Sequence, residues 1–167
     1  MRKPIVVEND KVEGTDKHNV TGQATNPAPP PPPTVPYTGV GDFDYVGKMT
    51  DQLSDFVSID GKPVALKSSK SSLNPGESAT PTGRHSGPMG KHFMPPPPPP
   101  APILATLQIP DPIGEGKPSV TAGSSFVKVN GVAILLDGDK IDTCDGTSKL
   151  MNSTVTAEQQ SFVACSE

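Results

Sequence analysis

Four side chains in this sequence have the chemistry of a single zinc site, although they lie far apart along the chain. They are the three histidines, His18, His85 and His92, and one of the two cysteines, Cys144. Three imidazoles and one thiolate complete a tetrahedral shell, which is the arrangement of a structural zinc. The spacing follows no fixed zinc motif, so they could equally be ordinary loop residues, and His85, between glycines in residues 83–87, fits that alternative best.

Residue patterns that would support catalysis are scarce. Glu77 and Glu115 are acids on the same stretch of chain as two of the histidines, but neither has a helical spacing to a histidine. A catalytic zinc needs an open coordination position and a nearby acid. No nucleophile has a recognisable base, and no glycine-rich phosphate loop precedes a helix. We therefore expect a protein that is not an enzyme, and a metalloenzyme is the weakest of the interpretations considered.

The elements that must position the four residues are copies of one hairpin. Residues 56–66 recur 70 positions later as residues 126–136. Each copy is a β-rich run, an Asp-Gly or Asn-Gly step at residues 60–61 or 130–131, and a second β-rich run. These dipeptides tolerate the positive φ angles of a type I′ turn. Both copies therefore predict a tight β-hairpin.

A third copy is split between the two ends of the chain. Residues 162–165 repeat the first strand, and residues 5–12 repeat the second strand, matching residues 134–141. If the terminal strands pair, the three copies form an all-β, pseudo-threefold object, a small cone of three hairpins. Cys165 is then expected to pack as a small apolar residue. The expected core positions on the strands are Val57, Ile59, Val127, Val129, Ile134 and Leu136.

Three long excursions separate the hairpins, at about residues 13–55, 71–125 and 142–161. In a threefold object they leave from the same end, so His18 on the first, His85 and His92 on the second and Cys144 on the third can converge there. A metal would then hold three loops together where the apolar core is thinnest.

Low-complexity sequence marks two of these excursions. Proline runs at residues 29–33 and 95–100 favour extended polyproline II structure, and their place between paired strands favours wrapping over the surface. Structureless loops of this length are unusual in a compact domain without a functional reason. Residues 46–53 are the one stretch that suits a short helix.

Composition sets the remaining limits. The 167 residues suit a single domain, residues 1–167, with proline-rich insertions at about 13–55 and 71–125. With 32% hydrophobic residues, no tryptophan and 22 prolines, the core must be small and would benefit from a metal or a partner. The net charge of -4 argues against nucleic-acid binding. No segment approaches the roughly 20 apolar residues of a membrane span, and the N-terminus lacks the apolar region of a signal peptide.

The hairpin units resemble the PAAR-like repeat of contractile injection systems. The resemblance covers the hairpins, which contain Lys-Pro-Val-Ala at residues 62–65 and Val-Ala-Ile-Leu at residues 132–135. It continues with Gly-Asp-Lys at residues 138–140 and a cysteine, and it ends at residues 145–146. The literal Pro-Ala-Ala-Arg motif is absent, and the excursions are longer and richer in proline than in compact members of the family. Both departures suggest a divergent branch.

The resemblance implies a mechanical function. Members of this family look like small cones, often with a zinc near the apex, and one copy sits on the blunt end of a trimeric β-helical spike. Such spikes belong to type VI secretion systems or related phage-tail-like particles, and the cone sharpens them for membrane puncture, sometimes with effector cargo. The chain would then be made in the cytoplasm and delivered outward at the particle tip. The alternative is a cytoplasmic proline-rich adaptor with a small β-domain.

Overall fold

The computed structural model describes residues 2–25, 33–73, 78–79, 85–86, 103–110, 114–143 and 153–166. The regular secondary structure of these residues is β-strand, as the sequence predicted, apart from one 3-10 turn, η1, at Leu104–Thr106. The strands are β1 (Arg2–Pro4), β2 (Lys11–Thr25), β3 (Thr34–Asp51), β4 (Ser58–Ile59), β5 (Lys62–Pro63), β6 (Lys70–Leu73), β7 (Ser78–Ala79), β8 (His85–Ser86), β9 (Glu115–Pro118), β10 (Lys128–Val129), β11 (Val132–Ala133), β12 (Lys140–Asp142), β13 (Ser153–Thr156) and β14 (Ala164–Ser166). No helix within these ranges has the length and apolar character needed to cross a bilayer.

The two continuous copies of the repeat are tight hairpins, as predicted. Strands β4 and β5 pair through Ile59 and Lys62, and strands β10 and β11 pair through Val129 and Val132. Each loop holds two residues, and both have positive φ, 52° and 74° at residues 60–61 and 49° and 82° at residues 130–131. This is the backbone of a type I′ turn, which explains the Asp-Gly and Asn-Gly dipeptides.

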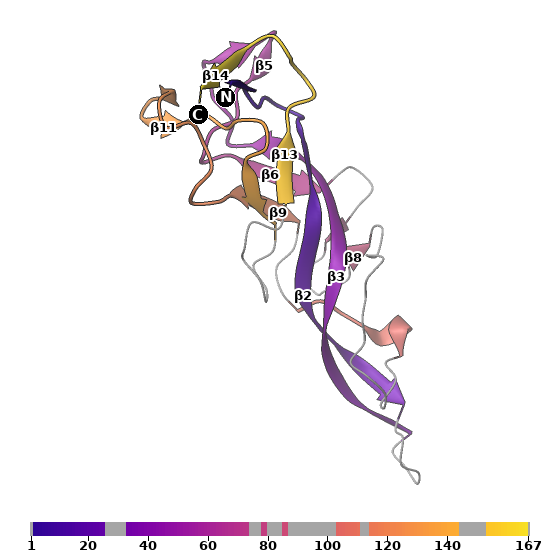
Figure 1. Ribbon diagram of the computed structural model, residues 1–167. Coiled ribbons are helices and arrows are strands. Elements are labelled where there is room, and N and C mark those ends of the chain that lie inside the picture. Colours follow the sequence, from indigo (N-terminus) through magenta and orange to yellow (C-terminus); the bar gives the residue numbers. More distant parts are fainter. Residues whose placement is uncertain are drawn as a thin grey trace.

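The third hairpin is assembled from the two chain ends. Strand β1 pairs antiparallel with β14, and Lys3 lies opposite Cys165. The two termini are therefore neighbours at the hairpin end of the molecule (Figure 1). Cys165 is half-buried and packs against apolar side chains of the core, in agreement with its expected place.

A pseudo-threefold axis passes through the centre of the three copies, where residues 5–7, 64–66 and 134–136 meet. Each of these segments bridges the other two. The backbone N–H of Val6 donates to the carbonyl of Leu135 over 3.0 Å, Leu135 donates to Ala65 over 2.9 Å, and Ala65 donates to Val6 over 2.9 Å. Three equivalent hydrogen bonds thus close a ring, and the predicted internal threefold symmetry is confirmed.

Successive side chains of the three central segments point to opposite sides, and this divides the core into two clusters. The cluster on the hairpin side contains Ile5, Val7, Ile59, Val64, Leu66, Val129, Ile134 and Leu136. The cluster on the other side contains Val6, Val12, Tyr45, Met49, Ala65, Ala122, Leu135, Ile141 and Val155. Four of the six predicted core residues are therefore buried, whereas Val57 is half-buried and Val127 is exposed.

The second cluster fills a closed barrel with the strand order β12-β13-β2-β3-β6-β9. Strands β2, β6 and β12 each continue from a hairpin copy, and β3, β9 and β13 each lead back toward one. Outgoing and returning strands alternate around the barrel. The three excursions therefore leave from the same end, as the threefold arrangement predicted.

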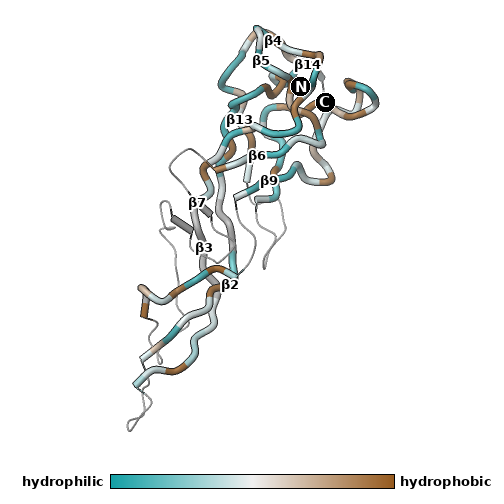
Figure 2. The backbone as a smooth tube through the Cα atoms, turned by 180° about the vertical axis from the view of Figure 1, so that it is seen from behind, coloured by the Kyte–Doolittle hydropathy of each residue, from teal (hydrophilic) through white to brown (hydrophobic). Residues whose placement is uncertain are grey.

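The first excursion differs from the predicted structureless loop. Strands β2 and β3 pair over fifteen residue pairs and extend past the barrel as a two-stranded stalk. Figures 1 and 2 show this stalk pointing away from the three hairpins. The molecule therefore narrows from a broad end built of hairpins to a thin one.

The predicted short helix at residues 46–53 is wrong, because most of this segment completes β3. Tyr45, Gly47 and Met49 are buried, while Val46 and Lys48 between them are partly exposed. This is the period of two that belongs to a strand. The strand forms because β3 pairs with β2 on one edge and with β6 on the other.

Candidate functional site

The structure describes two of the four residues that are predicted to bind zinc. His18 lies on β2 opposite Gly41, and its side chain is fully buried on the stalk face that also buries Val20 and Ala24. His85 lies on β8, paired with Ala79 of β7.

His92 and Cys144 lie outside the described residues. Cys144 directly follows Thr143, whose hydroxyl bonds the hydroxyl of Ser153 at 2.8 Å beside the barrel end. Among the residues that the structure does describe, no three His, Cys, Asp or Glu side chains form a metal-sized group. The zinc site therefore stays a prediction.

A second set of polar groups follows the threefold symmetry and joins the central segments to the barrel. Asp10, Ser69 and Asp139 occupy equivalent positions, and each side chain accepts the backbone N–H three residues before it. The bonds are Val7 N–H to Asp10 Oδ2 at 2.7 Å, Leu66 N–H to Ser69 Oγ at 2.8 Å, and Leu136 N–H to Asp139 Oδ2 at 2.8 Å. A side-chain oxygen at this position closes each turn.

Asp10 has a further structural function, because it binds the C-terminal segment. Its Oδ1 atom accepts the backbone N–H groups of Glu158 at 2.7 Å and Gln159 at 2.8 Å. Burial raises the pKa of the Asp10 carboxyl, and the backbone hydrogen bonds and the positive charge of Lys62 oppose that shift. This one side chain therefore holds together the two ends that form the split copy.

A third symmetric set lies just before each hairpin. Ser54, Ser124 and Gln160 accept the N–H groups of Val57, Val127 and Val163 at 3.0, 3.1 and 2.9 Å. Each bond fixes a turn that contains one phenylalanine. These residues are Phe56, Phe126 and Phe162, and their exposed fractions are 64%, 76% and 68%. We call them the phenylalanine ring.

The phenylalanine ring is a feature that sequence reasoning missed. The signal was present, because a phenylalanine begins every copy of the repeat. The repeat predicts that this phenylalanine starts a strand, whereas in the structure the strands begin two residues later, at residues 58, 128 and 164.

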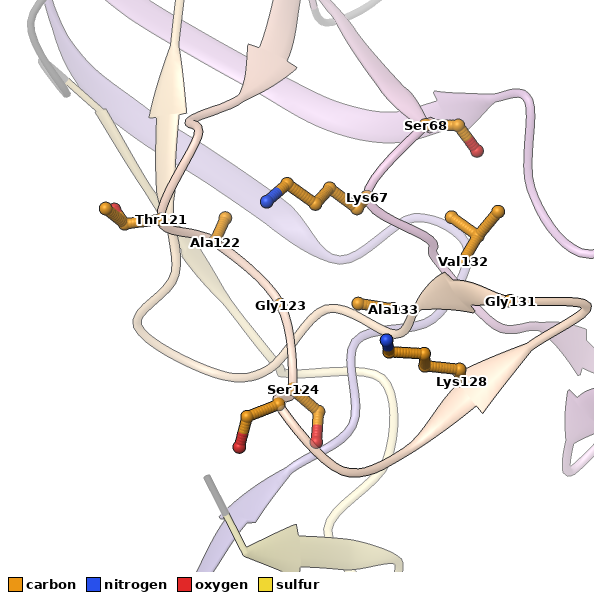
Figure 3. A pocket seen from close by; sticks show the side chains of 11 residues that line it. Lys67, Ser68, Thr121, Ala122, Gly123, Ser124, Lys128, Gly131, Val132 and Ala133 are labelled. Atoms are coloured by element: carbon orange, nitrogen blue, oxygen red, sulfur yellow. The ribbon is translucent and has the colours of Figure 1, made fainter.

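A groove also lies between two copies of the repeat (Figure 3). It is lined by Lys67 and Ser68 from one copy, by residues 121–125, and by Lys128 and residues 131–133 of the next hairpin. Lys67 Nζ donates to the carbonyl of Val120 at 2.6 Å. The positions equivalent to Lys67 are Glu8 and Asp137, so the charge of this groove is not repeated around the axis.

The fold and these symmetric sets define the chain as a small all-β protein with internal threefold pseudosymmetry. No model of a protein family, no curated protein and no solved structure matches the chain. Any more specific assignment must come from the residues and the geometry.

Proposed function

We propose that this chain is a non-enzymatic tip that caps a trimeric β-helical spike of a contractile injection system. The observation that supports the proposal is the closed ring of hydrogen bonds among Val6, Ala65 and Leu135. A single chain with an internal threefold axis suits a partner with a true threefold axis, because three similar contacts form at once. Resemblance of the hairpins to the PAAR-like repeat points to the same partner.

The shape of the chain suits a tip. The three hairpins form the broad end, and the β2–β3 stalk projects from the other end (Figure 1). Docking through the broad end would leave the narrow stalk leading toward a target membrane, which is contacted mechanically. We propose that the chain is made in the cytoplasm, is carried outward at the particle tip, and can take effector cargo with it.

The first prediction concerns stoichiometry. Co-expression with the trimeric spike protein of the same system should give a complex with one copy of this chain per three spike chains, measured by native mass spectrometry. A complex with three copies per trimer would contradict the proposal. Binding that survives changes in the hairpins but is lost on removal of residues 29–33 and 95–100 would favour the proline-rich adaptor instead.

A structural zinc is part of the proposal, held by His18, His85, His92 and Cys144. Two observations support it. The three excursions leave from one end of the barrel, and His18 is buried on the stalk that the first excursion forms. Zinc would supply no chemistry here beyond tying the excursions together.

The second prediction tests this zinc. Protein purified without chelator should contain about one zinc per chain, and Cys144→Ser should lower both the zinc content and the melting temperature. Cys165→Ser is the matched control, because Cys165 lies among the hairpins. Metal content by plasma mass spectrometry is the measurement. Wild-type protein that is stable and metal-free would remove zinc from the proposal.

A further inference from the structure

The phenylalanine ring is an exposed apolar feature that recurs around the pseudo-threefold axis. Phe56, Phe126 and Phe162 are exposed to similar extents, and the structure's other aromatic residues of known burial, Tyr37 and Tyr45, are buried. Single exposed apolar residues are normal on protein surfaces. Three phenylalanines at equivalent positions around one axis are a repeated pattern, which a partner with threefold symmetry can contact in the same way at all three places.

The turns that carry the ring are well defined. Each phenylalanine lies between a residue whose side chain accepts a hydrogen bond and the residue that donates it, as between Ser124 Oγ and Val127 N–H at 3.1 Å. Phe126 N–H also points to Ser124 Oγ, at 3.2 Å. The three phenylalanines therefore lie in turns that are fixed by equivalent hydrogen bonds. Because these turns are already ordered, less backbone entropy is lost on binding.

The side chains that all three copies share in these turns are apolar. The residue before the phenylalanine is Asp55 in one copy and serine in the other two, whereas the residue after it is valine in all three. A partner with three identical chains presents the same surface three times. It can therefore make the same side-chain contact with all three of these turns through the shared Phe-Val pair.

We propose that Phe56, Phe126 and Phe162 are the anchors of the docking surface, and that each enters the same apolar pocket on one of three identical partner chains. This inference rests on the proposed function, because the partner is the threefold end of the trimeric spike. Buried aromatic anchors dominate the energetics of many interfaces. Each phenylalanine should therefore contribute a similar share of the affinity, and the bound tip can take any of three orientations related by 120°.

The experiment measures the affinity of each variant for the purified spike trimer by biolayer interferometry. Phe56→Ser, Phe126→Ser and Phe162→Ser should each raise Kd by roughly 10- to 100-fold, with similar values for the three. Val120→Ser is the matched control. Val120 is 83% exposed, but its equivalents in the other copies are Thr50 and Thr156, so it is not part of a threefold set. Its Kd should equal that of the wild type.

The outcomes separate the inference from the proposed function. If the wild type binds one copy per trimer and the phenylalanine variants bind equally well, the anchors are wrong and the proposed function stands. A large loss in only one of the three variants also overturns the inference. If the wild type does not bind the trimer, both fail. Self-association of the wild type that the same variants abolish would identify a second copy of this chain as the occupant, and would also overturn the inference. Because the changed side chains are exposed, unchanged melting temperatures should show that all variants fold.

Discussion

Asp10→Ala is expected to lower the free energy of unfolding by roughly 3–5 kcal/mol, because it leaves one buried and two partly buried donors without an acceptor. These donors are the backbone N–H groups of Val7, Glu158 and Gln159. The first belongs to a central segment, and the other two belong to the strand connection that completes the split copy. Urea denaturation followed by circular dichroism gives the measurement.

Asp10→Ser is the informative comparison, because Ser69 occupies the equivalent position in another copy and accepts the N–H of Leu66 at 2.8 Å. A serine at position 10 should keep the bond from Val7 and lose the bonds from Glu158 and Gln159. We expect it to be destabilised by about half as much as Asp10→Ala. Equal stability of Asp10→Ser and the wild type would show that the link to the C-terminal segment contributes nothing.

The same residue predicts a pH dependence with a definite sign. Burial raises the pKa of Asp10 above its ordinary value of 3.8, so the folded state holds this proton more tightly than the unfolded state. The stability that this proton contributes is fully present below pH 3.8 and is lost as the pH rises through the raised pKa. The wild type's advantage over Asp10→Ala should therefore shrink with rising pH in that range. An advantage that grows with pH would show that the three hydrogen bonds outweigh burial.

The hairpins and their symmetry could be predicted from the sequence because their signals are local and repeated. Asp60-Gly61 and Asn130-Gly131 specify a turn without help from the rest of the chain. The split copy followed by comparison with the two continuous ones. The two tight hairpins are each specified within one supersecondary unit, and the split copy was predictable only because its two halves repeat the same pattern.

The barrel and the stalk could not be predicted in the same way. Strands β2 and β3 contain glycines and charged residues that have low β-propensity, and they form because they pair with each other. Gly47 shows the long-range origin of this pairing, since a Cβ atom there would lie 2.4 Å from the carbonyl oxygen of Ser72 on β6. No local pattern identifies a glycine that is needed by a strand more than twenty residues away.

The candidate sites also differ in how far the sequence could predict them. The repeat predicts that the excursions leave from one end, and residue type alone suggests the zinc site, of which His92 and Cys144 lie outside the described residues. The exposure of the phenylalanine ring could not be predicted from the sequence. A phenylalanine at the start of a β-rich run is ordinarily a core residue, and only the structure shows that all three are exposed.

The largest packing effect is expected at the centre of the pseudo-threefold axis. Leu135 is fully buried beside Val6 and Ala65, its equivalents in the other copies. Leu135→Ala should cost about 2–5 kcal/mol, the usual range for a buried leucine that leaves a cavity. Ala65→Leu should cost about 1–3 kcal/mol, because Ala65 is fully buried and the added atoms would overpack the cluster. Chemical denaturation of both single variants provides the reference values.

The double variant Ala65→Leu/Leu135→Ala decides whether these side chains share one space. If the three central residues surround a common axis, moving the leucine from one copy to another keeps the total volume of the cluster. The double variant should then be more stable than the sum of the two single changes predicts, by at least about 1 kcal/mol. Leu73 supplies the control, since it packs against the same cluster as a partly buried side chain of β6, away from the central ring. Ala65→Leu/Leu73→Ala should therefore be additive. Additivity in both double variants would mean that the ring of hydrogen bonds is symmetric while the packing around it is not, and each copy would then have its own separate core.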